Sequence, residues 1–145
     1  MKKWIFAIPA LLVLFSGCLD SQSASPDPAK ITIKGLEFYT NLAPALDAAG
    51  VQGKPVFVYA QSEFCGWCRK FEEETFTNTS VINILNENFI LVSIDVDRQK
   101  NETRNFRVHG TPTEIFLDPK GTEIRRIPGY TDTETFLNTI IELKS

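Results

Sequence analysis

Apolar runs and amphipathic stretches alternate along this chain, and their order predicts a layered domain. Residues 56–60 are apolar throughout, which suits a strand buried on both faces of a sheet. Residues 89–96 are rich in β-branched side chains and predict a second strand. Residues 114–117 and 123–127 flank the turn sequence Asp118-Pro119-Lys120-Gly121, so they are expected to form a hairpin.

Helices are predicted between these strands, and a short strand is expected over 30–33. The predicted helical segments are 43–49, 65–76, 81–86 and 99–106. Asn41 is placed to cap the first of them. A last helix is expected to start at Thr131, which would form a capping box with Glu134. Its predicted apolar face consists of Phe136, Leu137, Ile140 and Ile141. This order predicts an α/β three-layer sandwich with a central mixed β-sheet flanked by helices.

The N-terminal part of the chain has a different pattern. A positive start, Met1–Lys3, precedes the apolar run Trp4–Phe15, which the small residues Ser16–Gly17 close. This is the layout of a secretory signal peptide, expected over residues 1–17. The apolar run is shorter than the roughly 20 residues that a membrane-spanning helix needs.

The small residues directly before Cys18 resemble a bacterial lipobox, the motif whose cysteine is lipidated and becomes the mature N-terminus. The resemblance covers four residues, with Phe15 where leucine is usual. It implies a lipid anchor on Cys18, a flexible tether over residues 18–33 and a folded domain over 34–145. The alternative is an ordinary signal peptide, or a retained anchor, in which Cys18 is incidental.

Composition narrows the class of protein further. A chain of 145 residues with 43% hydrophobic content fits one globular domain. The net charge is −3 with both signs scattered, so no nucleic-acid partner is expected. Lipidation of Cys18 would leave two cysteines, an even number that suits an oxidising compartment.

Those two cysteines, Cys65 and Cys68, carry the clearest chemistry in the sequence. They follow a predicted strand, open a predicted helix and are separated by Gly66 and Trp67. A cysteine in the first turn of a helix lies near unpaired backbone N–H groups and the positive end of the helix dipole. That environment favours the thiolate, which is the form that attacks a disulfide. A disulfide across so short a loop adds little stability, which weakens a purely structural interpretation.

With these features, the chain resembles the thioredoxin superfamily over most of its length. The matching features are Cys65-Gly66-Trp67-Cys68 after a buried strand, Gly110-Thr111-Pro112-Thr113 before another strand, and Gly129 after the hairpin. The sequence around Cys65 is most similar to thioredoxin-related proteins that bacteria and archaea export. The resemblance implies a thioredoxin-like fold and thiol:disulfide oxidoreductase activity that needs no cofactor and no metal.

The resemblance also implies roles for particular residues. Cys65 would be the exposed attacking thiol and Cys68 the buried resolving thiol. Pro112 would be cis and face the disulfide, and the backbone of Thr111 would pair with an extended substrate chain. Trp67, together with Phe64, would add an apolar rim that grips partner chains. Ordinary packing is the alternative for both aromatic residues.

One departure from the family concerns proton transfer. Thioredoxins of the cytosolic type carry a buried aspartate six residues before the first cysteine, where it accepts the proton of the second. Tyr59 occupies that position here. Glu63 is a candidate substitute but is expected to be exposed, and His109, the single histidine, is expected to face solvent. The proton acceptor for Cys68 therefore stays open.

The sequence predicts an extracytoplasmic, membrane-anchored oxidoreductase of the cell envelope or periplasm, acting as a reductase. Its expected partners are exported proteins with disulfides, a membrane or extracytoplasmic redox partner, and the membrane itself through a lipid anchor. A thioredoxin-fold binding or chaperone-like module with little redox turnover is the main alternative. Metal binding by the two thiolates is a weaker one, because zinc sites usually need four ligands.

Overall fold

The computed structural model describes residues 29–144, so the expected signal peptide, Cys18 and most of the expected tether lie outside the described residues. Within residues 29–144 the chain forms a six-stranded sheet in the order β1-β2-β4-β3-β5-β6. The strands are β1 (Lys30–Ile33), β2 (Leu36–Tyr39), β3 (Val56–Gln61), β4 (Ile90–Asp95), β5 (Thr113–Leu117) and β6 (Glu123–Pro128). The helices are α1 (Leu42–Gln52), α2 (Gly66–Glu74), α3 (Thr79–Asn88), α4 (Lys100–Asn105) and α5 (Thr133–Leu143).

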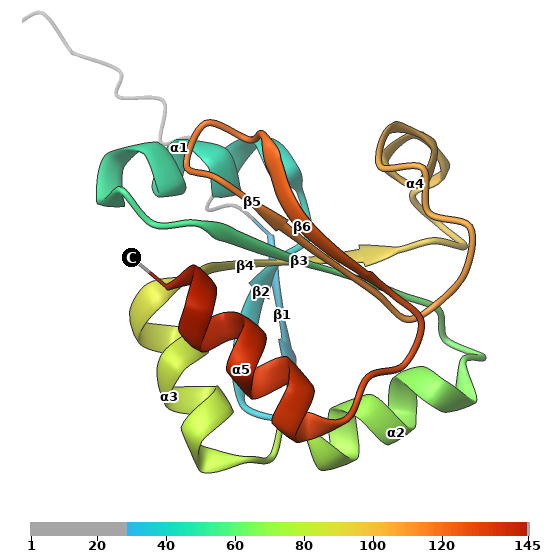
Figure 1. Ribbon diagram of the computed structural model, residues 1–145. Helices are drawn as coiled ribbons and strands as arrows, with labels where there is room; N and C mark the ends of the chain where they lie inside the picture. Colours follow the sequence, from blue (N-terminus) through green and yellow to red (C-terminus); the bar gives the residue numbers. More distant parts are fainter. Residues whose placement is uncertain (1–28, 145) are drawn as a thin grey trace, which may run out of the picture.

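The sheet is mixed and lies between two layers of helices, which confirms the predicted fold class. β3 runs parallel to β4 and antiparallel to β5. Helices α1 and α4 cover one face of the sheet, and α2, α3 and α5 cover the other (Figure 1). The first five residues of β3 are fully buried, as expected for an apolar strand with neighbours on both edges and both faces.

The two sides of the sheet have cores of different composition. On the α1 side the core is made of small and aliphatic residues, among them Ala45, Ala49, Val58 and Ile115. On the α2 side it is mainly aromatic, and its fully buried rings are Phe38, Phe57, Tyr59, Phe71, Phe76, Phe116 and Phe136. Burying each such side chain contributes about 1.5–3 kcal/mol. This aromatic core fixes α2, and with it the cysteine pair, on the sheet.

The ends of several elements differ from the prediction. The sheet starts at Lys30, earlier than the domain boundary expected at residue 34, because 30–33 pairs with the unpredicted strand β2. Asn78 caps α3 through hydrogen bonds from two backbone N–H groups, so this helix starts before residue 81.

The prediction for the last helix is partly wrong. Asp132, not Thr131, is its N-cap residue and accepts a hydrogen bond from the backbone N–H of Thr135. Phe136 and Ile140 are buried as expected, whereas Ile141 is exposed, so the buried face of the helix is narrower than predicted. None of the helices within residues 29–144 is long and apolar enough to cross a membrane.

Candidate active site

The two cysteines form a disulfide at the start of α2. Cys65 is the N-cap residue of the helix and is half-buried, whereas the side chain of Cys68 is only 1% exposed. The backbone N–H of Cys68 donates a hydrogen bond to Sγ of Cys65 at 3.0 Å. A sulfur at Cys65 therefore sits where an N-cap acceptor belongs, at the positive end of the helix. This arrangement favours a negative charge on that sulfur.

A second loop lies beside the disulfide because of the register of the sheet. Ala60, near the end of β3, pairs with Thr113 at the start of β5, so Pro112 is placed next to the chain that leads into Cys65. The Thr111–Pro112 peptide bond is cis, which confirms the expectation from the family resemblance. The backbone N–H of Gly129 donates to the carbonyl oxygen of Pro112 at 2.9 Å. Gly129 has a φ of 85°, a conformation that favours glycine.

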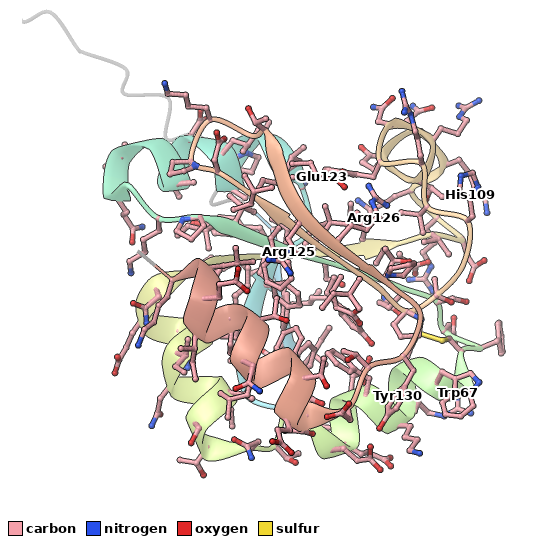
Figure 2. All side chains as sticks on the ribbon, in the orientation of Figure 1. Trp67, His109, Glu123, Arg125, Arg126 and Tyr130 are labelled. Carbon is pink, nitrogen blue, oxygen red and sulfur yellow. A yellow bond between two sulfur atoms is a disulfide. The ribbon has the colours of Figure 1, made fainter. Side chains whose placement is uncertain are left out.

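Aromatic side chains surround the disulfide on the solvent side. Phe64 is 86% exposed and Trp67 58% exposed. The Trp67 ring lies 5.3 Å from the ring of Tyr130, next to the disulfide (Figure 2). The Nζ atom of Lys70 lies 4.9 Å from the Tyr130 ring and 5.3 Å from the Trp67 ring. We call Phe64, Trp67 and Tyr130 the aromatic rim; Tyr130 was not predicted, although its place directly after Gly129 was a clue.

Tyr59 lies beneath the disulfide. Its ring is fully buried, and its hydroxyl donates to a carboxylate oxygen of Glu72 at 3.0 Å. The same hydroxyl lies 3.4 Å from the backbone carbonyl oxygen of Cys68. Burial and the neighbouring Glu72 carboxylate raise the pKa of Tyr59 well above its ordinary value. The residue that replaces the family's aspartate therefore stays neutral and holds α2 in place.

Glu63 and His109, the other two residues considered for proton transfer, are both on the surface rather than buried beside Tyr59. Glu63 is exposed and forms an ion pair with Arg98 at 3.5 Å. His109 is exposed as expected and lies apart from the disulfide in Figure 2. It lines a groove of about 650 Å³ between α4 and the loop that contains Thr111. This groove runs past the exposed side of the Thr111 loop.

Glu114, which the sequence predicts only as a strand residue, is a buried carboxyl. Its side chain is fully buried, and neither carboxyl oxygen has a hydrogen-bond partner. Burial raises the pKa of Glu114 to about 8, against a smaller lowering by its own backbone N–H. A single acidic residue inside an otherwise apolar strand was the available clue.

The described residues offer no obvious metal centre. Within residues 29–144, no three histidine, cysteine, aspartate or glutamate side chains are grouped as metal ligands would be. The chemistry that the arrangement supports is the making and breaking of the Cys65–Cys68 disulfide.

Known proteins match this geometry and sequence. A family model described as a thioredoxin-like domain matches residues 42–144. The thiol:disulfide interchange protein DsbD of Yersinia pestis (strain Pestoides F) is 36% identical over 102 residues, which cover 65% of this chain and 17% of that protein. DsbD of Actinobacillus pleuropneumoniae serotype 5b (strain L20) is 34% identical over 100 residues, which cover 63% of this chain. The chain thus spans only 17% of the length of these relatives.

A solved structure is similar over most of the described chain. The solution structure of a thioredoxin from Thermus thermophilus has a TM-score of 0.64 and 30% sequence identity, and the match covers 71% of this chain and 83% of that one. The sheet, the disulfide at the start of α2 and these matches show that the chain belongs to the thioredoxin-like family.

Proposed function

We propose that this protein reduces disulfides in exported proteins outside the cytoplasm, with Cys65 as the attacking thiol and Cys68 as the resolving thiol. The observation that carries the proposal is the unequal exposure of the two sulfurs. Cys65 is half-buried at the N-cap of α2, and Cys68 is buried behind it. A partner protein can reach the sulfur of Cys65. The sulfur of Cys68 is buried, so it can react only with Cys65 in the same molecule.

In the reduced protein, the Cys65 thiolate attacks one sulfur of the substrate disulfide. The substrate disulfide breaks, a mixed disulfide forms on Cys65, and the other substrate sulfur leaves as a thiolate. Cys68 then loses its proton and attacks Sγ of Cys65. This second attack breaks the mixed disulfide, closes Cys65–Cys68 and releases the second substrate thiolate. The substrate gains two electrons and two protons, and a separate dithiol reductant must restore the Cys65–Cys68 pair.

The surface around Cys65 supports binding of an extended peptide. Thr111 is half-buried at the edge of the open groove that its loop shares with α4. We infer that the backbone of Thr111 pairs with a substrate segment while Pro112 faces the disulfide. Trp67 and the rest of the aromatic rim would contact apolar side chains on either side of the substrate cysteine. Such contacts select unfolded or flexible segments over compact surfaces.

The proposed location rests on the sequence before the described residues. The apolar run Trp4–Phe15 and the small residues before Cys18 support export followed by lipidation of Cys18. Expression in a bacterial host with labelled palmitate tests this. Label on the wild type and none on Cys18→Ser supports the anchor, and an unlabelled wild type contradicts it.

Insulin reduction with dithiothreitol as the electron source tests the activity. We expect turnover by the wild type and none by Cys65→Ser. Equal rates for the two proteins, or no rate above the uncatalysed reaction, would instead favour a binding or chaperone-like module. The equilibrium with glutathione tests the direction. A reduction potential near about −270 mV supports a reductase, and one near about −120 mV supports an oxidase.

A further inference from the structure

Two buried polar side chains flank Tyr59 in the sheet beneath the disulfide. Glu114 on β5 is the register partner of Tyr59 on one side, and Ser93 on β4 is its partner on the other. Within residues 29–144, Ser93 Oγ and the two Glu114 carboxyl oxygens are the buried side-chain oxygen or nitrogen atoms that lack a hydrogen-bond partner. Such groups are rare in native structures and need an explanation.

Directly opposite residues in an antiparallel pair point to the same face of the sheet, with their Cβ atoms about 4.5–5.5 Å apart. Tyr59 faces the aromatic core that contains Cys68, so Glu114 faces that side as well. The Tyr59 hydroxyl reaches the backbone carbonyl of Cys68. Glu114 also stands only two residues after Pro112, in the strand that starts at the active-site loop. The unpartnered carboxyl therefore lies on the face of the sheet that α2 covers, in the same core as the buried Cys68.

We propose that Glu114 carries the proton that the Cys68 thiol gives up and takes back during disulfide exchange. This assignment rests on the proposed roles of Cys65 and Cys68. Glu114, on the neighbouring strand β5, would take the role of the buried aspartate whose sequence position Tyr59 occupies.

The proton balance holds in both directions. When the mixed disulfide is resolved, the Glu114 carboxylate accepts the proton of the Cys68 thiol, directly or through one water. The Cys68 thiolate then attacks Sγ of Cys65 and displaces the substrate thiolate. When a dithiol reductant attacks Cys65 in the oxidised protein, the disulfide breaks and Cys68 leaves with the electron pair. The protonated Glu114 then delivers its proton to that buried thiolate.

The groups that face Glu114 leave it free for this role. Tyr59 on β3 has its hydroxyl engaged with Glu72 on α2. On β6 the register partner is Ile127, and the residues of α5 that pack into this core include Phe136 and Ile140, all apolar. None of the ion pairs formed within residues 29–144 involves Glu114. Because its pKa is raised to about 8, the group can both hold and release a proton near neutral pH.

Stopped-flow reaction of the reduced protein with dithiobis(nitrobenzoate) tests the proposal, since each step releases one coloured thiolate. The first phase reports attack by Cys65 and the second reports resolution by Cys68. In the wild type we expect the second phase to accelerate through an inflection near pH 8. Glu114→Gln should lose this inflection, and its second phase should be slower than that of the wild type by at least about tenfold. The rate of its first phase should stay within about twofold of the wild-type rate. Glu114→Asp should restore part of the rate, and Glu73→Gln, an exposed carboxyl on α2, should match the wild type.

A second measurement needs no substitution of Glu114. The side-chain carboxyl carbon of Glu114, followed by ¹³C NMR, should titrate in one step in the oxidised protein. In the reduced protein it should titrate in two coupled steps, because the negative charge of a Cys68 thiolate would raise the pKa of the Glu114 carboxyl. Reduced Cys68→Ser should return to one step.

Several results would overturn the proposal. One is a Glu114→Gln variant that keeps the wild-type pH profile in both phases. Another is loss of the inflection in Glu72→Gln alone, which would assign the proton to Glu72. A third is a Glu114 titration unaffected by reduction of the disulfide. If the wild type showed neither kinetic phase, the proposed function would fail, while the NMR titration would still decide whether Glu114 and Cys68 share a proton.

Discussion

The Tyr59 hydroxyl and the Glu72 carboxylate are joined by a hydrogen bond of 3.0 Å that links the central strand β3 to α2. The same hydroxyl lies 3.4 Å from the carbonyl oxygen of Cys68, so it contacts the helix at two turns. The Tyr59 ring also stacks on Phe71 at 5.8 Å between centroids. A residue that replaces an acid of the family thus anchors the helix that carries the disulfide.

Tyr59→Phe should destabilise the oxidised protein by about 1.5–3 kcal/mol. The substitution keeps the ring in the aromatic core but removes the hydrogen bond to a charged acceptor. Urea unfolding followed by circular dichroism measures the change. Tyr39→Phe is the matched control, because no side-chain hydrogen bond within residues 29–144 involves the Tyr39 hydroxyl. Equal loss of stability in the two variants would contradict the anchoring role of Tyr59.

Asn78→Ala should lower the free energy of unfolding by about 1 kcal/mol. The Asn78 side chain accepts hydrogen bonds from the backbone N–H groups of Ser80 and Val81 at the start of α3. Asn41 stands at the N-cap of α1 but makes no side-chain capping bond. Asn41→Ala should therefore cost only a few tenths of a kcal/mol. Thermal unfolding of both variants gives the comparison, and a larger loss for Asn41→Ala would reverse the expected order.

Helix positions and strand positions were predictable where the sequence has a long or strongly patterned segment. The apolar stretch before Cys65 became β3, and the Asp118–Gly121 turn joins β5 to β6 as expected. β2 was missed because its four residues, Leu36–Tyr39, show alternation too short to stand out. All four residues pair with β1, and this pairing, together with a single register position shared with β4, defines the strand rather than its own short pattern.

Some residues of the candidate site were predictable from the sequence and others were not. Cys65, Cys68 and cis Pro112 were predictable because they lie in short contiguous motifs. Glu114 was not, because it faces Tyr59 only through the register of β3 and β5. Tyr130 was not, because it meets Trp67 only through the loop that follows β6. A local sequence pattern cannot show that an acid on one strand faces a tyrosine on the next. The place of Glu114 beside Tyr59 is therefore visible only in the folded sheet.

Phe64→Ser should raise the KM for a peptide disulfide about 5- to 30-fold with kcat within about twofold. Phe64 is 86% exposed, so its removal should take away apolar contact with the substrate and little else. The expected range corresponds to about 1–2 kcal/mol of lost binding. Val51→Ser, at an 89% exposed position on α1, is the control and should leave KM unchanged. A fall in kcat with constant KM would place Phe64 in the chemical step rather than in substrate binding.

The stability of the oxidised protein should fall as pH rises from 5 to 8 because of Glu114. Its pKa is about 8 in the folded protein against 4.5 for an ordinary glutamate. Between these values the folded state keeps a proton that the unfolded state has released, so the free energy of unfolding decreases with pH. The decrease is complete above about pH 8 and amounts to at most about 5 kcal/mol. Glu114→Gln lacks this titration, so its unfolding free energy should change far less across the window, whereas Glu73→Gln should follow the wild type. Urea unfolding at each pH measures the difference, and parallel curves for the wild type and Glu114→Gln would show that the carboxyl is ionised in the folded protein well below pH 8.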